Sequence, residues 1–142
     1  MKKKHTLFDS YLRKNDGRYT QQKQEIATEI FKTKGHFEVE NFIDDFRTTT
    51  KKLSRATVYR TIKQLLDAGL LQKISTRDGK IYYEQSTPQN HHAHVICNDC
   101  GNIQEIRDKK LNEFINMYCT KLNFTAEYQS LHVYGTCKKC TP

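Results

Sequence analysis

The sequence predicts an α+β protein, with an N-terminal winged helix-turn-helix domain followed by a small α/β dimerisation domain. Three observations predict it: helical periodicity followed by a hairpin pattern in the first half, positive charge concentrated in that half, and two C-x-x-C pairs in the other half. We place the domains at residues 1–85 and 91–142, with a hinge at 86–90, where Ser, Thr, Pro, Gln and Asn follow one another.

Three amphipathic helices are predicted before residue 50. The first covers about 6–14 and ends at Asn15-Asp16-Gly17. Thr20 caps the second helix, which carries apolar residues at helical spacing until Gly35 stops it. The third covers about 39–48. These helices predict a compact helical core at the start of the chain.

A fourth helix, between Ser54 as N-cap and Gly69 as terminator, has two distinct faces. Its apolar stripe is Val58, Ile62, Leu65 and Leu66. The opposite face and its flank carry Ala56, Thr57, Tyr59, Arg60, Lys63 and Gln64. Small residues permit close approach to DNA, and Arg and Gln can read base edges in the major groove. A solvated helix face can have the same composition, so the face alone leaves both interpretations open.

A basic hairpin follows this helix. Residues 70–75 and 80–84 are β-like, and the turn 76–79 ends in Asp78-Gly79, which is typical of hairpins. Arg77 and Lys80 at the tip are candidates for phosphate contacts, as in the wing of a winged helix-turn-helix. Together, helix, turn, helix and hairpin favour DNA binding over the solvated-face alternative.

The net charge of +8 is unevenly distributed. Residues 1–85 contain 18 Lys/Arg against 11 Asp/Glu, a net charge of +7, whereas residues 86–142 contain 6 against 5, a net charge of +1. The basic half is therefore the candidate for a polyanionic partner, although a solubilising surface is the alternative. No stretch is apolar enough for a membrane span or signal peptide, and we expect a cytoplasmic protein.

The second half predicts a small α/β module. Strand-like segments at about 94–97 and 102–106 precede a helix at about 108–122, and a strand at about 127–134 follows it. The helix displays Leu111, Ile115, Tyr118, Cys119 and Leu122 on one side. Because this core is too small to be convincing alone, we expect a homodimer.

Four cysteines predict a structural metal site. Cys97, Cys100, Cys137 and Cys140 form two C-x-x-C pairs, which deliver four thiolates to one tetrahedral ion such as Zn²⁺. A closed shell of four protein ligands leaves no position for water or substrate, so the ion would be structural. Cys119 stands apart from the pairs, and its role is not predicted.

A second group of ligand types is less specific. His92 and His94 lie on one face of an extended segment, and Glu105 on the paired segment can approach that face. With His36 and Glu84 they would form a nitrogen and oxygen set that suits Fe²⁺, Mn²⁺ or Zn²⁺. From spacing alone, His36 is also explained as a helix-start residue and Glu84 as a solvated strand end.

These residues resemble the ferric uptake regulator family of bacterial metalloregulators over nearly the whole chain. The resemblance is carried by residues 56–60 (ATVYR), 91–101 (HHAHVICNDCG) and 135–140 (GTCKKC). It implies a dimeric, metal-dependent repressor that binds partly palindromic operators in double-stranded DNA.

The resemblance also implies individual roles. Cys97, Cys100, Cys137 and Cys140 match the structural zinc ligands, and His36, Glu84, His92, His94 and Glu105 match a regulatory site that bridges the two domains. Tyr59 and Arg60 match residues that face DNA, and Arg18 matches a basic position that reaches the minor groove in some relatives.

Differences from the family pattern bear on the metal and on the inducing chemistry. A third site of many relatives uses His91, an acidic residue where Ala93 stands, an acidic residue near Asn112 and a histidine near Gln129, so we do not expect it in its usual form. His132 is either a substitute one strand repeat away or a plain strand histidine. Peroxide-sensing relatives tend to have Asp at position 105, and zinc-sensing relatives often have a cysteine shortly before the histidines. Elimination leaves Fe²⁺ as the expected corepressor, with peroxide, zinc and manganese sensing as alternatives.

The sequence does not favour an enzyme. A zinc deaminase needs H-x-E and P-C-x-x-C motifs with only three protein ligands, but His92-Ala93-His94 supplies no such glutamate and no proline precedes Cys97. A thiol-disulfide oxidoreductase would place C-x-x-C at a helix start within a βαβ unit. The remaining alternative is a metal-independent DNA-binding protein whose zinc is only structural.

Overall fold

The computed structural model describes residues 1–49, 53–87, 92–127 and 129–142, and it divides the chain into two compact units. Unit 1 comprises Met1–Ile74 and Ile81–Thr87, and unit 2 comprises Ser75–Lys80 and Pro88–Pro142. The proposed limits of the domains remain a prediction, and hinge residues 88–90 lie outside the described residues, as does His91.

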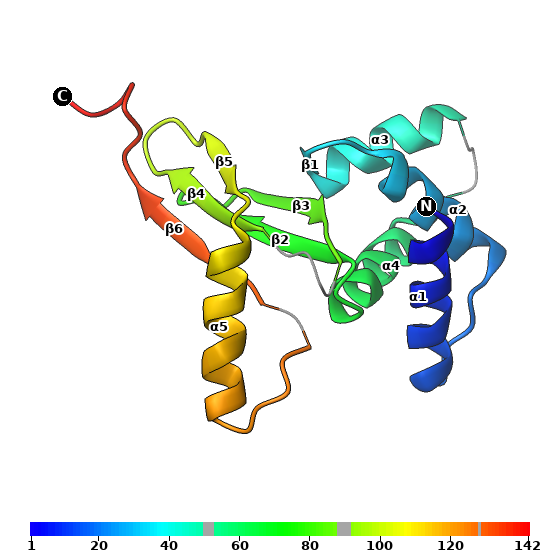
Figure 1. Cartoon of the computed structure of the whole chain (residues 1–142). Helices are drawn as coiled ribbons and strands as arrows, with labels where there is room; N and C mark the ends of the chain where they lie inside the picture. The colour runs from blue at the N-terminus through cyan, green and yellow to red at the C-terminus, as the bar shows by residue number, and fades with distance from the viewer. Residues whose placement is uncertain (50–52, 88–91, 128) are drawn as a thin grey trace. The chain divides into compact units, whose positions relative to one another are not determined.

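Unit 1 is a helical core with a small antiparallel sheet (Figure 1). Its helices are α1 (Lys2–Lys14), α2 (Gln21–Lys32), α3 (Val39–Thr49) and α4 (Arg55–Asp67). Its strands β1 (His36–Phe37), β2 (Leu71–Ser75) and β3 (Ile81–Gln85) are ordered β1-β3-β2. This is the winged helix-turn-helix arrangement that the sequence predicts.

The core of unit 1 is formed by the predicted helix faces. Ile26, Ile30 and Phe31 of α2 are buried, and Val58, Ile62 and Leu65 of α4 are buried against the same cluster, whereas Leu66 is half-buried. Burial of these side chains is the main stabilising contribution to the unit.

The ends of the helices follow the predicted stop and start residues with one correction. Thr20 Oγ1 accepts a hydrogen bond from Lys23 N at 3.3 Å, which is the predicted cap of α2. Gly35 and Gly69 have φ of +73° and +74°, a conformation that glycine adopts without steric cost. Ser54 is the N-cap of α4, but within the described residues its side chain makes no capping hydrogen bond.

Two elements of unit 1 differ from the prediction. Helix α1 begins at Lys2 instead of residue 6, because Lys4 donates to Gln85 Oε1 at 2.5 Å and lies over the Phe31 ring, contacts that hold the first turn. Strand β1 was not predicted, because two residues are too few for a period-2 pattern. His36 therefore lies in a strand and is not a helix-start residue.

Unit 2 contains a three-stranded sheet and one long helix (Figure 1). Strand β4 (Ala93–Cys97) lies between β5 (Ile103–Ile106), which is antiparallel to it, and β6 (His132–Gly135), which is parallel. Helix α5 (Lys109–Lys121) follows β5, and Asp108 caps it by accepting from Lys110 N at 2.9 Å. The described helices include none long and apolar enough to cross a membrane.

The last strand was predicted too early. Residues 127–134 were expected to be extended, but β6 covers only His132–Gly135. The pairing with β4 explains this difference, because it starts with His94 opposite His132 and His94 N donates to Leu131 O at 3.0 Å. Tertiary pairing, and not local pattern, sets the start of this strand.

The predicted apolar side of α5 is incompletely covered in a single chain. Leu111, Ile115 and Cys119 are half-buried, whereas Tyr118 is 49% and Leu122 75% exposed. Along α5, all of which the structure describes, no residue is fully buried. Unit 2 therefore presents a large apolar surface to its surroundings.

Candidate metal sites and nucleic-acid interface

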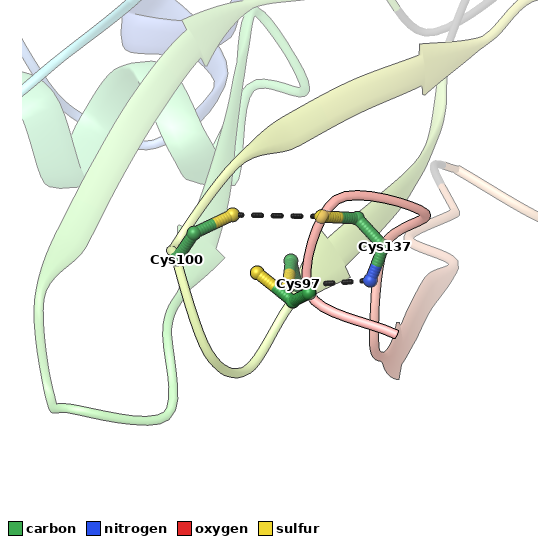
Figure 2. Close-up of side chains that lie close together, drawn as sticks. Cys97, Cys100 and Cys137 are labelled. Carbon is green, nitrogen blue, oxygen red and sulfur yellow. Dashed lines mark hydrogen bonds between the residues drawn. The ribbon is translucent and has the colours of Figure 1, made fainter. Parts of the chain in front are cut away.

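The four cysteines come together at one end of the unit 2 sheet. Cys97 is the last residue of β4, and its register partner in the parallel strand β6 is Gly135. Parallel strands end at the same edge of a sheet, so the turn with Cys100 and the turn with Cys137 and Cys140 meet there. Figure 2 shows Cys97, Cys100 and Cys137 around the shared space.

The spacing of the sulfur atoms fits a tetrahedral ion. All four Sγ atoms lie within 4.8 Å of one another, and Cys100 Sγ is 3.7 Å from Cys137 Sγ (Figure 2). A tetrahedron with metal–sulfur bonds of about 2.3 Å has sulfur–sulfur edges of about 3.8 Å. The donor set and its dimensions therefore match a structural zinc site.

Electrostatics within the cysteine cluster favour a bound cation. Backbone N–H groups of Cys100 and Cys137 lower the pKa of Cys97 to about 6, and Cys137 N donates to Cys97 Sγ at 3.3 Å. Hydrogen bonding with Cys137 raises the pKa of Cys140 to about 12. One thiolate forms readily, whereas further deprotonation needs a positive ion among the sulfurs.

Unit 1 contributes one pair of ligand-type side chains. His36 on β1 is the antiparallel partner of Glu84 on β3, so both side chains lie on one face of the sheet. His36 is exposed, and its ring contacts Tyr82 at 4.9 Å between centroids. Glu84 is only 6% exposed, which contradicts its interpretation as a solvated strand end.

Unit 2 contributes a second and denser group. His94 on β4 is the partner of Glu105 on β5, and His92 Nδ1 is 3.9 Å from Glu105 Oε2. His92 is 9% exposed and His94 is completely buried. Arg107 also contacts Glu105, with Nη2 2.6 Å from Oε2. Imidazole and carboxylate groups that converge in this way are ligands that Fe²⁺, Mn²⁺ and Zn²⁺ accept.

The third site of many relatives has a different chemistry here. Gln129 Nε2 donates to Asn112 Oδ1 at 2.5 Å, so two amides contact each other near the positions where the resemblance implies a histidine and an acidic residue. His132 lies beside His94, with ring centroids 5.7 Å apart. Cys119 lies on α5 and is not one of the four clustered cysteines.

Most of the residues predicted to contact DNA are accessible. Ala56, Tyr59, Arg60 and Lys63 on α4 are exposed, whereas Thr57 and Gln64 are half-buried. Arg77 and Lys80 are exposed on the turn between β2 and β3, which Thr76 N closes by donating to Lys80 O at 2.9 Å. Arg18 is exposed before α2. Basic side chains are therefore accessible on α4, on the turn between β2 and β3, and before α2.

Two features near these basic side chains were not predicted from the sequence. Lys23 on α2 has a lowered pKa, because of partial burial and the positive charge of Arg60, so these two cations are neighbours. Glu40 on α3 accepts hydrogen bonds from Arg55 and Tyr59 of α4. Those contacts lower the pKa of Glu40 and raise the pKa of Tyr59. Separations of 15 and 19 residues give no local pattern from which the contacts could be predicted.

Comparison with known proteins decides the family. A model of the Ferric uptake regulator family matches residues 14–134. This chain belongs to that family. The "Ferric uptake regulation protein" of Vibrio parahaemolyticus serotype O3:K6 is 34% identical over 102 residues, which cover 72% of this chain and 68% of that protein.

Two further relatives extend the similarity along the chain. The "Peroxide-responsive repressor PerR" of Staphylococcus saprophyticus is 28% identical over 138 residues, 96% of this chain and 92% of that protein. A crystal structure of the Vibrio cholerae ferric uptake regulator has 28% identity and a TM-score of 0.59, covering 91% of this chain and 98% of that one. That regulator shows a structural rearrangement of its DNA-binding domains.

Membership establishes the class of activity. The ferric uptake regulator family consists of metal-responsive transcriptional regulators that bind DNA and form dimers, so this protein is a transcriptional regulator and not an enzyme. The family includes iron-responsive and peroxide-responsive members. Family membership therefore establishes the class of protein. The metal or oxidant to which this protein responds depends on the residues of its own metal sites.

Proposed function

We propose that this protein is a homodimeric cytoplasmic repressor that binds a partly palindromic operator when Fe²⁺, or a similar divalent ion, occupies a regulatory site. The regulatory ligands are His36, Glu84, His92, His94 and Glu105. A structural Zn²⁺ is bound by Cys97, Cys100, Cys137 and Cys140. The observation that carries the proposal is the pairing of His36 with Glu84 in unit 1 and of His94 with Glu105 in unit 2.

The two pairs suggest how metal would control DNA binding. An ion with ligands from both units would restrict their relative motion, because each metal–ligand bond fixes a distance. A dimer reads two half-sites about one helical turn apart, and this spacing must match the two α4 helices. Metal that binds the DNA-competent arrangement more tightly shifts the population toward it.

The ligand chemistry supports Fe²⁺ and does not exclude its competitors. Nitrogen and carboxylate ligands bind Fe²⁺, Mn²⁺ and Zn²⁺, with affinity generally rising along the divalent series toward zinc. Intracellular availability, and not only ligand type, therefore selects the ion. Glutamate at position 105, where peroxide-sensing relatives tend to have aspartate, favours iron sensing. The 28% identity to a peroxide-responsive repressor keeps peroxide sensing as the second candidate function.

The exposed face of α4 is the proposed reading surface. Arg60 and Tyr59 reach base edges or sugars in the major groove, with Ala56 permitting close approach and Thr57, Lys63 and Gln64 alongside. Arg77 and Lys80 of the wing, and Arg18 before α2, contact phosphates or the minor groove. Replacement of Arg60 by Ala should weaken operator binding by about 1–3 kcal/mol if the side chain contacts a base.

Unit 2 supplies the proposed dimer contact. Phe114, Leu122 and Phe124 are 56%, 75% and 64% exposed, and Val133 on the edge strand β6 is 47% exposed. Apolar surface of this kind is typical of interfaces between permanently associated subunits. Among the strands that the structure describes, β6 pairs only with β4, so its other edge can pair with a second copy.

An anaerobic metal titration of operator binding tests the proposal. An operator is first selected from random duplexes with the wild-type protein, and its affinity is measured against rising Fe²⁺, Mn²⁺ and Zn²⁺. Metal should raise the affinity at least tenfold, because repression requires differential binding. The double variant His92→Ala/His94→Ala should abolish this dependence while retaining its zinc content and its dimeric mass.

Two further measurements complete the test. Glu105→Ala, which removes another proposed ligand, should also abolish the metal dependence. Glu113→Ala removes an exposed carboxylate of α5 outside the ligand set and serves as its matched control. Operator affinity that stays the same with and without every metal would overturn the sensor function and leave a metal-independent DNA-binding protein. If the iron-loaded protein loses operator binding after brief exposure to peroxide, and a ligand histidine gains mass, the protein is a peroxide sensor and not an iron sensor.

A further inference from the structure

A three-residue contact links α3 to the start of α4. Glu40, the second residue of α3, accepts both guanidinium branches of Arg55, with Oε2 2.7 Å from Nη1 and Oε1 2.5 Å from Nη2. The Tyr59 hydroxyl donates to the same Oε1 at 2.5 Å. The Glu40 carboxylate therefore accepts hydrogen bonds from both the Arg55 guanidinium and the Tyr59 hydroxyl on α4.

The contact is at the surface and contributes little to the fold. The side chains of Glu40 and Arg55 are 48% and 53% exposed, and Tyr59 is 43% exposed. Solvent-exposed ion pairs contribute little to stability, because water screens their attraction and ordering two long side chains costs entropy. Stability therefore gives a weak reason for this arrangement, and its position beside the DNA-facing residues gives a stronger one.

The location of Glu40 is one that suits an anion. Arg55 is the first residue of α4, and the first turn of that helix contains no acidic residue of its own. The N-terminal end of a helix carries partial positive charge and exposed N–H groups, which favour phosphate or carboxylate. Arg55 adds a full positive charge there. Glu40 on α3 supplies a negative charge at this cationic position.

We propose that Glu40 substitutes for a DNA phosphate and holds down the phosphate-driven part of the affinity for any duplex. The inference rests on the proposed DNA-binding role of α4. While Arg55 is paired with Glu40, a DNA phosphate beside Arg55 adds little binding energy, because the carboxylate already neutralises the cation and repels the phosphate. Base contacts made only with the operator then account for a larger share of the binding energy than they would with Arg55 free.

The proposal has a quantitative consequence for salt dependence. Loss of the Glu40 charge makes one more cation per protomer available to phosphates of any duplex. Each added phosphate contact makes the slope of log K against log salt steeper by about 0.9, so a dimer changes by about 1.8. At 0.1 M salt this corresponds to at most about an eightfold gain in affinity per contact.

Glu40→Gln in the full-length dimer is the main test, because the amide keeps the size of the side chain and removes its charge. Fluorescence anisotropy with an unrelated duplex, across salt concentrations of about 0.05 to 0.2 M, should show tighter binding with the steeper slope. Operator affinity should rise by a similar factor, because the operator presents the same phosphates as any other duplex. Asp44→Asn is the matched control, since it removes an exposed negative charge from the same helix α3.

A second variant tests the pair from its other side. Arg55→Ala should leave the affinity for the unrelated duplex nearly unchanged, whereas Lys63→Ala should weaken it. In the Arg55→Ala background, Glu40→Gln should no longer tighten binding, which a double-mutant cycle measures directly. Circular dichroism and melting temperature check that each variant is folded.

The outcomes separate this inference from the proposed function. Equal gains for Glu40→Gln and Asp44→Asn would overturn the inference, because the effect would then be net charge alone. A loss for Arg55→Ala as large as that for Lys63→Ala would also overturn it. Metal-independent operator binding by the wild type would overturn the sensor function instead, and the measurements on the unrelated duplex would still decide the role of Glu40.

Discussion

The two units differ in how their apolar side chains are protected from water. In unit 1, residues such as Phe8, Leu12, Ile30 and Ile43 are at most 1% exposed. In unit 2, Phe114, Leu122 and Phe124 are each more than half exposed. Unit 1 therefore has a core of its own, whereas unit 2 leaves several large apolar side chains exposed.

This difference corresponds to a division of labour. A DNA-reading unit has to keep α4 in one fixed orientation, and a complete core provides that rigidity. A dimerising unit must instead leave apolar surface for its partner, and four metal–sulfur bonds can replace the stability that burial does not supply. Two pairs of variants test this difference between the units, and a third pair compares two helix starts within unit 1; the expected effects decrease from the first pair to the last.

Removal of the cysteine ligands should have the largest effect. Structural zinc contributes about 10–16 kcal/mol of apparent binding energy in small zinc domains, so Cys137→Ser/Cys140→Ser should unfold unit 2 and abolish the dimer. Unit 1 should remain folded. Amide correlation spectra, zinc content and sedimentation provide the measurements. Cys119→Ser, which lies outside the cluster, is the control and should retain the zinc content and the amide spectrum of the wild type. Well-dispersed unit 2 signals in the zinc-free double variant would show that unit 2 folds without the metal.

Leucine truncation should distinguish the two surfaces next. Leu12→Ala removes a side chain that is 1% exposed and should lower the free energy of unfolding by about 2–5 kcal/mol, because it leaves a cavity. Leu122→Ala, where the side chain is 75% exposed, should cost less than about 0.5 kcal/mol within one chain. Urea titrations at several protein concentrations measure both. A concentration-independent loss at Leu122 equal to that at Leu12 would show that unit 2 has a core like that of unit 1.

The smallest effect concerns two helix starts within unit 1. Thr20→Ala removes the side-chain acceptor of Lys23 N and should cost about 1 kcal/mol. Ser54→Ala should cost little, because the structure gives Ser54 no capping hydrogen bond with the described residues. Thermal unfolding followed by circular dichroism compares the two. A larger loss for Ser54→Ala would show that α4 depends on its own cap and not on Glu40.

Local patterns in the sequence were sufficient for most elements. Helical spacing predicted α2, α3, α4 and α5 to within a few residues, since each helix buries or presents one face. The strands that were displaced or missed have a different cause. Strand β1 has two residues and exists through its pairing with β3, and β6 starts where His94 meets His132. Such pairings depend on residues far apart in the chain.

The candidate sites divide along the same line. The cysteine cluster was predictable because C-x-x-C turns and the chemistry of zinc are both local, and the sulfurs do converge. His36 and Glu84 could not be joined by pattern, because they are far apart in the sequence and meet only through strand pairing. The contacts of Glu40 with Arg55 and Tyr59 escaped prediction for that reason too.

The sequence by itself determined the helix faces, the basic first half and the set of metal-binding residue types, because each depends on neighbouring residues or on composition. Tertiary structure decided which of those residues face one another: His36 opposite Glu84, His94 opposite Glu105, and Glu40 against Arg55. It also decided that α5 remains partly exposed. Strand register and helix packing are set by the fit of distant surfaces, and no local pattern contains that fit.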